Sequence, residues 1–236
     1  MRAFVFLCGS LLLGCSSTSS TADGGGGDAT ADTGGGGDDA AGDAGPSAYC
    51  PAGATLVPFL SDTRVGTFPK AQMVLEQGKD YFAVLETDAG RLVLDLYEKN
   101  APITVNSFVF LTLNHFYDGT AFHRVIEGFM AQGGDPNSIS KPPNTWGTGG
   151  AGYTFGLELD MSLDFNARGV LGEARGQGPN TNGSQFFITL VPYPSLNQQY
   201  TVFGKVLEGD KTLDGIVRGE PPMNPTRVTE AHICQK

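Results

Sequence analysis

The sequence predicts a mainly β domain, a closed antiparallel barrel with two helices, and three observations support this class. Strand-like stretches are short and numerous, and Gly-rich loops separate them. Only two stretches have a helical pattern. The first 49 of the 236 residues contain a tract rich in Gly, Asp, Ala and Thr, which offers almost no large apolar surface to offset ordering entropy and cannot supply a core. Many short strands with two helices in one unit favour a closed barrel over an open sheet.

Residues 1–14 are typical of a signal peptide. Arg2 precedes an apolar stretch, 3–13, that is too short for a transmembrane helix. The stretch ends in Leu-Leu-Gly-Cys, with Cys15 last, which resembles the lipobox of bacterial lipoproteins. The resemblance implies cleavage before Cys15 and lipid on its sulfur and its new amino group. The alternative is an ordinary secretory signal with a chance cysteine, and on either interpretation the chain is exported.

Residues 15–49 are expected to be the lipidated cysteine and a disordered linker, which leaves 50–236 as the folded domain. Glycine runs at 24–27 and 34–37 stand among aspartates, so the linker is flexible and self-repelling. No apolar run of 18 residues occurs, so only the lipid would hold the chain at a membrane. The net charge of −10, without a basic stripe, argues against a nucleic-acid partner.

The elements of the domain follow from local pattern. Residues 51–72, punctuated by proline, are expected to be an extended lead-in. Residues 81–87 and 91–97 alternate apolar and polar side chains around an Asp-Ala-Gly turn, which predicts a hairpin. Pro102 opens a helix that reaches about His115, with its bulky side chains on one broad face. The remaining expected elements are strands at 120–124, 129–132, 168–171, 185–190, 201–206 and 226–233, and a helix at 210–217.

Cysteine and histidine usage bears on disulfides and metals. Cys50 and Cys234 stand at the two ends of the expected domain, and in an oxidising compartment a disulfide is favoured over two free thiols. The three histidines are scattered and no Cys-x-x-Cys occurs, so we expect neither a metal nor a cofactor.

Four blocks of sequence closely resemble the cyclophilin-type peptidyl-prolyl isomerases (rotamases). They are FHRVIEGFMAQGGD at 122–135, TGGAGYTF at 148–155, GPNTNGSQFFI at 178–188 and VFGKV at 202–206. The resemblance runs from about 73 to 234. It implies an eight-stranded antiparallel barrel capped by two helices, with the active groove on the outer face. It also implies a monomer whose partners are proline-containing polypeptides.

The chemistry of such an enzyme explains these residue types. Rotation about an X–Pro bond crosses about 18–20 kcal/mol, because amide resonance is lost at the twisted state. No covalent bond changes, so neither a nucleophile nor a cofactor is required. The catalyst needs an apolar recess for the proline ring and a fixed donor for the twisted amide nitrogen, which binds the transition state better than the ground state.

The resemblance assigns roles to ten side chains. Arg124 is the expected donor, Gln132 is expected to position its guanidinium and to bind the substrate backbone, and Phe129 completes the catalytic set. The expected substrate-binding residues are Met130, Ala174, Arg175, Gln185, Phe187, Leu196 and Tyr200. The competing interpretations are a surface ion pair for the arginine and plain core for the aromatic residues. We favour core for Phe122, Phe186 and Phe203.

Strand alternation supports part of this assignment, because Gln185 and Phe187 share a face while Phe186 points the other way. Alternation alone does not bring Phe129 and Met130 into one pocket. Their joint placement is implied by the resemblance, with a bend expected at Gly128.

The chain also departs from the family pattern. Gly172-Glu173 replaces the usual Ser-Met, which places a charge beside the expected groove. The loop 136–146 is longer than in short bacterial members, and an idle surface loop is favoured there over a partner contact. His123 lies near Asp118 and Glu127, but no serine has a nucleophile-elbow context, so a hydrolase is not supported.

The predicted function is therefore a prolyl isomerase that assists the folding of exported proteins. We expect it to be lipid-anchored to a bacterial cell envelope, facing the periplasm or the cell surface. The outer membrane is favoured because Ser16 does not resemble an inner-membrane retention signal. A cyclophilin-like module that binds proline peptides without turnover is the main alternative, and a structural envelope lipoprotein is a minor one. Arg124, Gln132 and Phe187 together favour the enzyme.

Overall fold

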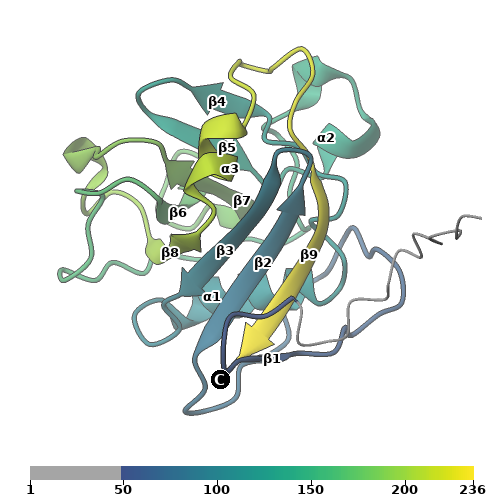
Figure 1. Ribbon diagram of the computed structural model, residues 1–236, viewed down its shortest axis with the longest axis vertical. Helices are drawn as coiled ribbons and strands as arrows, with labels where there is room; N and C mark the ends of the chain where they lie inside the picture. The colour runs from purple at the N-terminus through teal and green to yellow at the C-terminus, as the bar shows by residue number, and fades with distance from the viewer. Residues whose placement is uncertain (1–48) are drawn as a thin grey trace, which may run out of the picture. The chain divides into compact units, whose positions relative to one another are not determined.

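Residues 49–236 are the part of the chain that the structure, a computed structural model, describes (Figure 1). The predicted signal peptide, Cys15 and nearly all of the predicted linker lie outside these residues. Within 49–236 no helix has the length and apolar character needed to cross a membrane.

The strands are β1 Thr55–Leu56, β2 Tyr81–Thr87, β3 Gly90–Leu96, β4 Arg124–Ile126, β5 Met130–Gly133, β6 Val170–Arg175, β7 Asn182–Thr189, β8 Val202–Glu208 and β9 Val228–Gln235. The helices are α1 Pro102–Thr112, α2 Asn137–Ser140 and α3 Asp210–Gly215, with short 3₁₀ turns at Pro143–Thr145 and Pro194–Leu196.

The described strands form one antiparallel sheet in the order β1-β9-β2-β3-β8-β6-β7-β5-β4. The prediction of a mainly β, antiparallel domain is confirmed. Eight of the strands match the expected number, and β1 adds two residues to the edge of β9. Outside the strand pairs, backbone hydrogen bonds from Gly119 to Val228 (2.7 Å) and from Phe122 to Thr226 (2.9 Å) link the chain before β4 to the start of β9. The chain just before β4 therefore lies beside the start of β9.

The strand limits differ from the expected ones where pattern was weak. The hairpin β2–β3 lies where alternation placed it, with Asp88 and Ala89 in the turn. The strand expected at 120–124 is wrong in its position, because β4 begins only at Arg124. Residues 120–122 make isolated contacts with the segment 226–228 instead of pairing along a strand. The apolar residues there are buried by this crossing, so their pattern resembled a strand.

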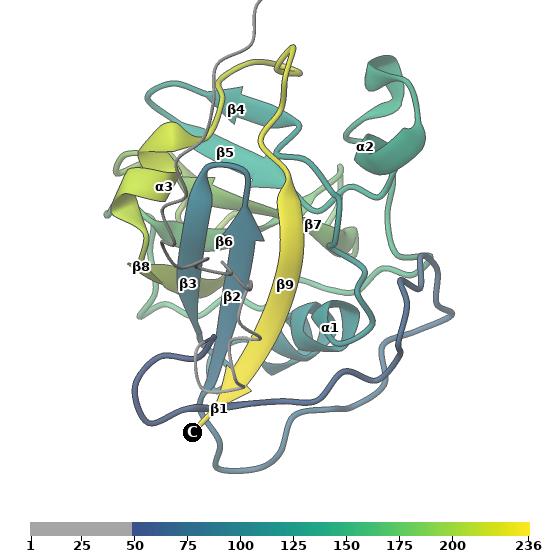
Figure 2. The ribbon, with the colours of Figure 1, turned by 45° about the vertical axis from the view of Figure 1, so that its right-hand side comes forward.

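Helix α1 is shorter than predicted and is buried on all sides. It begins at Pro102 as predicted but ends at Thr112, and His115 has a left-handed φ of 56°. Every residue from 104 to 112 is buried, so the helix has no solvent face. The lead-in segment covers the side that the sheet does not: Asn106 accepts from the Val74 amide (2.8 Å) and donates to the Gln72 carbonyl (2.9 Å). Figure 2 shows this segment running along the outside of α1.

The apolar side chains form a main core and a smaller cluster. The main core contains Phe122, Phe186 and Phe203, each with no exposed surface, which confirms the assignment of these three to core. The smaller cluster contains Met130 and Phe187. Adjacent residues Phe186 and Phe187 thus belong to different clusters, as alternation along β7 requires.

The two ends of the described domain are joined covalently. Cys50 and Cys234 form a disulfide with their Cα atoms 5.7 Å apart. Cys234 lies in β9, opposite Leu56 of β1 on one side and Phe82 of β2 on the other. The disulfide therefore fixes the start of the lead-in segment to β9, which lies between β1 and β2 in the sheet.

Candidate active site

A pocket of about 180 Å³ opens on the outer side of the strands that carry the signature blocks. Nine of the ten side chains proposed for the groove line it: Arg124, Phe129, Met130, Gln132, Ala174, Arg175, Phe187, Leu196 and Tyr200. Seven come from β4, β5, β6, β7 and the turn at 194–196, while Phe129 directly precedes β5 and Tyr200 precedes β8. Residues up to 76 positions apart in the sequence thus surround one small apolar recess.

The floor of this pocket is apolar and tightly packed. Met130 and Phe187 are almost fully buried, and Leu196 closes the side. The Phe187 ring stacks on Phe165 with 5.4 Å between centroids and meets Tyr200 edge-on at 5.6 Å. A recess of this size and chemistry suits a five-membered apolar ring.

Gly172 makes room for that floor. It lies opposite Phe187 in the β6–β7 pairing, and a Cβ at this position would overlap the Phe187 ring. The absence of a side chain at this position therefore permits the ring to lie against the β6 backbone.

Phe129 and Met130 reach the pocket together because the chain turns just before β5. Gly128 has a φ of +70°, in the left-handed region that glycine adopts readily, which confirms the expected bend. Phe129 leaves this turn to pack on Tyr193, with 4.4 Å between ring centroids, and Met130 opens β5.

Arg124 lies at the rim, in β4, directly across from Gln132 in β5. Its guanidinium carbon is 6.0 Å from the centre of the Phe129 ring. The expected contact with Gln132 is absent among the hydrogen bonds of the described residues. The Arg124 Nε instead donates to a carboxylate oxygen of Glu220 at 3.2 Å. The sequence carried no signal for Glu220, because it lies 96 positions away in an irregular loop.

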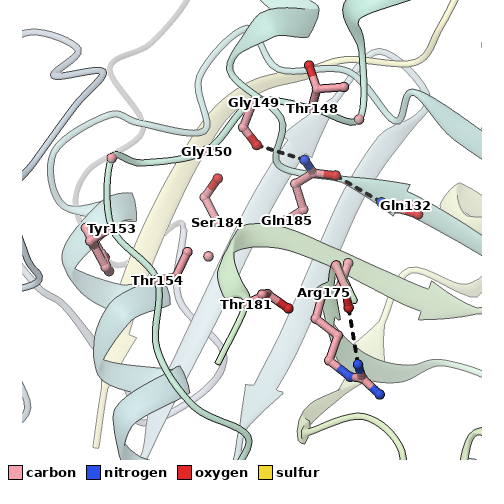
Figure 3. A pocket seen from close by; sticks show the side chains of 15 residues that line it. Gln132, Thr148, Gly149, Gly150, Tyr153, Thr154, Arg175, Thr181, Ser184 and Gln185 are labelled. Carbon is pink, nitrogen blue, oxygen red and sulfur yellow. Dashed lines mark hydrogen bonds between the residues drawn. The ribbon is translucent and has the colours of Figure 1, made fainter. Parts of the chain in front are cut away.

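A larger, more polar hollow of about 590 Å³ adjoins the first and shares Gln132, Ala174 and Arg175 with it. Gln185 lines this hollow and not the smaller pocket. Its amide donates to the Gly149 carbonyl at 2.8 Å and accepts from Gln132 at 2.9 Å, as Figure 3 shows. Gln132 is thus fixed by Gln185 at the boundary between the two hollows.

The loop that walls the larger hollow is held by a buried aspartate. Asp135 has no exposed surface, and its carboxylate accepts hydrogen bonds from the backbone amides of Asn137 (2.7 Å), Gly147 and Gly149 (3.2 Å). Sequence reasoning used the 148–155 block only as part of the resemblance and did not assign this region to the site. The glycines of that block leave the hollow open.

Arg175 separates the two hollows. Its Nε donates to the Gln199 carbonyl at 3.0 Å, and its guanidinium carbon lies 5.0 Å from the centre of the Tyr200 ring. A second donor reaches the Gly176 carbonyl at 3.2 Å. Backbone carbonyls and the ring thus hold the Arg175 side chain in place.

Glu173 does not place a charge beside the groove, and that expectation is wrong. The side chain points to the opposite side of β6 from Ala174 and is only 3 % exposed. Burial raises the pKa of its carboxyl well above the ordinary value, more than the hydrogen bond from the Gly183 amide (3.2 Å) lowers it. The carboxyl therefore holds its proton to a higher pH than an exposed glutamate does, inside the domain and away from the groove.

His123 takes no part in a triad within residues 49–236. Burial lowers the pKa of its imidazole, so the ring is neutral at neutral pH. The two acids near it in sequence have other partners: Asp118 bonds His115 at 2.8 Å and Glu127 bonds Arg218 at 2.8 Å.

The expected idle loop at 136–146 is partly ordered by its own contacts. It contains α2 and a 3₁₀ turn, and the Trp146 indole donates to the Lys141 carbonyl at 2.9 Å. None of its residues lines either hollow.

The geometry combines three features: an apolar recess, a guanidinium at its rim and a more polar hollow beside it. Such an arrangement is chemically able to hold an apolar ring and to direct N–H donors at a neighbouring polar group without forming a covalent bond.

Comparisons with known proteins agree. The sequence model of the family "Cyclophilin type peptidyl-prolyl cis-trans isomerase/CLD" matches residues 82–233. Peptidyl-prolyl cis-trans isomerase-like 1 of Gibberella zeae is 40% identical over 161 residues, which cover 65% of this chain and 94% of that protein. Peptidyl-prolyl cis-trans isomerase CYP18-1 of Arabidopsis thaliana is 46% identical over 154 residues, covering 63% and 93%.

Solved structures agree as well. The crystal structure of a Cryptosporidium parvum cyclophilin-type isomerase in the presence of the dipeptide Ala-Pro has a TM-score of 0.58 and 33% identity, covering 64% of this chain and 98% of that one. The chain belongs to the cyclophilin-type peptidyl-prolyl cis-trans isomerase family. It is an enzyme of class EC 5.2.1.8, and its substrates are proline-containing polypeptides.

Proposed function

We propose that Arg124 stabilises the twisted X–Pro amide while the proline ring occupies the pocket over Phe187, in exported proteins that this lipid-anchored enzyme helps to fold. The observation that carries the mechanism is the meeting of Arg124, Gln132 and Phe187 around one recess of about 180 Å³. A guanidinium at the rim of such a recess lies next to the nitrogen of a bound X–Pro amide. That nitrogen becomes pyramidal and more basic at the transition state, so the donor binds it more strongly then.

The competing interpretation of Arg124 is a surface ion pair, and it does have an acidic partner in Glu220. Exposed pairs of this kind contribute about 0–1 kcal/mol to stability. A surface ion pair of this strength does not explain why the guanidinium lies over Phe129 at the mouth of the pocket.

Replacing Arg124 by alanine tests the mechanism. We expect kcat/KM for a proline-containing test peptide to fall about a hundredfold, as when one preorganised donor is lost. A coupled peptide isomerisation assay on the purified full chain measures it. Arg168→Ala is the matched control, because Arg168 also pairs with an acid, Asp214, but lines neither hollow. Equal rates for wild type and Arg124→Ala would overturn the mechanism.

The proposed location rests on the sequence of residues 1–49 and on cysteine chemistry. A signal-like stretch that ends in a lipobox-like Leu-Leu-Gly-Cys directs the chain to export and lipidation at Cys15. A disulfide between Cys50 and Cys234 suits an oxidising compartment outside the cytoplasm. The linker after Cys15 would hold the enzyme near the envelope without fixing its orientation, and the outer membrane is the favoured site.

Metabolic labelling with palmitate tests the anchor. In a bacterial host the full chain should incorporate label and sediment with membranes, because the lipid on Cys15 is its proposed membrane contact. Cys15→Ser should lose the label and appear in the soluble exported fraction, while Cys8→Ser should behave as wild type because Cys8 lies within the cleaved segment. Labelling that persists in Cys15→Ser would contradict the assignment.

A further inference from the structure

The loop between α3 and β9 runs beside β4 and is held there by backbone pairing. The Val125 amide donates to the Gly219 carbonyl at 2.8 Å, and the Gly219 amide donates back to the Val125 carbonyl at 2.9 Å. Gly219 has a φ of +148°, and a Cβ there would lie 2.6 Å from Pro222 Cα. The residue after Gly219 is therefore placed next to the residue before Val125, and these are Glu220 and Arg124.

A second set of contacts, made by the neighbouring residue Arg218, fixes the same part of the loop. The Arg218 Nε donates to Glu127 at 2.8 Å, in the turn between β4 and β5. A terminal nitrogen of Arg218 donates to the Asp214 carbonyl at 2.7 Å, at the end of α3. The loop thus cannot shift along β4 at this point without breaking the contacts of both Arg218 and Gly219.

This placement sets which nitrogens of Arg124 are available to a substrate. A guanidinium has five N–H donors in a rigid planar fork. Glu220 accepts the single N–H on Nε at 3.2 Å, and Phe129 lies within 6.0 Å of the guanidinium carbon. Within the part of the chain that the structure describes, the two terminal nitrogens of Arg124 make no hydrogen bond, so their four N–H groups remain free at the pocket.

We propose that Glu220 is a positioning residue for catalysis, which holds the Nε edge of Arg124 so that the terminal nitrogens present themselves to the X–Pro amide. The proposal rests on the proposed role of Arg124. An arginine side chain has many rotamers, and an unanchored guanidinium at a half-exposed site spends much of its time away from the pocket. Glu220 is 51 % exposed and Arg124 41 %, so the pair adds little to stability and its effect is on orientation.

The test compares Glu220→Ala and Glu220→Gln with wild type in the peptide isomerisation assay on the purified full chain. In Glu220→Ala the anchor is lost, and kcat should fall about tenfold with KM nearly unchanged, because misplacement weakens only the interaction made at the transition state. Glu220→Gln keeps a side-chain oxygen that accepts the Nε–H and should recover most of that loss. Glu208→Ala removes the same charge at an exposed position outside both hollows and should retain wild-type kcat.

A double variant shows whether Glu220 acts through Arg124. Arg124→Ala/Glu220→Ala should have the same kcat as Arg124→Ala alone, because the anchor has nothing left to hold. Thermal unfolding of each variant, with a midpoint equal to wild type, excludes loss of fold as the cause. Wild-type kcat in Glu220→Ala, no recovery in Glu220→Gln, or additive effects in the double variant would each overturn the inference. Full activity in Arg124→Ala would instead overturn the proposed mechanism itself, so the two failures are distinguishable.

Discussion

Gly172 and Phe187 face each other across β6 and β7, and the glycine has a specific reason to be there. Any side chain at 172 would occupy the space of the Phe187 ring, which is the floor of the pocket. The ring is itself held by Phe165 behind it and Tyr200 at its edge. An added methyl group would therefore push it toward the open side, where the substrate proline is proposed to bind.

Gly172→Ala should accordingly reduce the pocket and lower kcat/KM about tenfold, together with an overpacking cost of about 1–3 kcal/mol in the free energy of unfolding. Isomerisation kinetics and denaturant unfolding measure the two effects. Gly215→Ala is the matched control, since a Cβ there makes an ordinary 3.5 Å contact with Ala89 at the end of α3. An alanine at 172 with wild-type kcat/KM would show that the Phe187 ring has room to move without loss.

Glu173, the next residue, shows how one buried acid links stability to pH. Its carboxyl lies near Tyr117, Tyr153 and Glu158, all uncharged or acidic, and no basic side chain is among the causes that shift its pKa. Burial raises the pKa above the ordinary 4.5, so the folded state keeps a proton that the unfolded state loses. This group therefore stabilises the fold fully below about pH 4.5, and its contribution is lost as pH rises toward the folded-state pKa.

Glu173→Gln should remove that pH dependence, because the amide is neutral in both states and its oxygen still accepts from the Gly183 amide. The difference in unfolding free energy between variant and wild type should grow in favour of glutamine above pH 4.5. Its slope should be at most about 1.4 kcal/mol per pH unit, the value for one proton. Urea unfolding from pH 4 to 8 measures it, with the exposed Glu208→Gln as control. A constant difference across that range would contradict a raised pKa for Glu173 in the folded state.

Among the elements, the sequence pattern predicted best the limits of those that are set by neighbouring residues. Alternation located β2 and β3 to within a residue, and Pro102 marked the start of α1. The apolar pattern of α1 predicted one buried face, but residues 104–112 are buried on every side. The outer side of the helix is covered by the lead-in segment, which carries no periodic signal in the sequence. The sequence pattern also misplaced the strand before Arg124, since burial by the crossing segment 226–228 looks the same in sequence as burial in a strand.

The N-terminus of α1 shows a contact that no local pattern predicts. Ala101 at the N-cap has no side chain to accept a hydrogen bond. Glu158, from a distant loop, accepts instead from the amides of Ile103 (3.0 Å) and Thr104 (2.7 Å) and from the Thr104 hydroxyl (2.8 Å). A carboxylate at this end also interacts favourably with the helix dipole. Capping of this helix is therefore a property of the tertiary structure.

At the scale of the whole domain, one bond joins the two ends of the described chain. The Cys50–Cys234 disulfide closes a sequence separation of 184 residues, and such closure mainly restricts the unfolded chain. The pocket is built mainly from β4, β5, β6, β7 and the turn at 194–196, and these strands have their own pairings. We therefore expect loss of this bond to lower the stability of the domain without much change in the geometry of the site.

Reduction of the disulfide should lower the free energy of unfolding by about 2–5 kcal/mol while kcat/KM stays within about twofold of the oxidised enzyme. Guanidinium unfolding and isomerisation assays with and without dithiothreitol measure both quantities. Cys50→Ala provides the control, because its stability should match that of the reduced wild type and should not respond to reductant. A large loss of activity on reduction would show that the ends of the domain control the pocket.

Taken by itself, the sequence determined the class of fold and nine of the residues that meet in the pocket, because turns, alternation and signature blocks are written in neighbouring residues. Only the tertiary structure decided that Glu220 and not Gln132 bonds Arg124, that Gln185 belongs to the larger hollow, and that Glu173 is buried with a raised pKa. Each of these depends on which strands and loops become neighbours. A contact between residues 96 positions apart, such as Arg124 and Glu220, is set by the order of the strands and leaves no trace in local pattern.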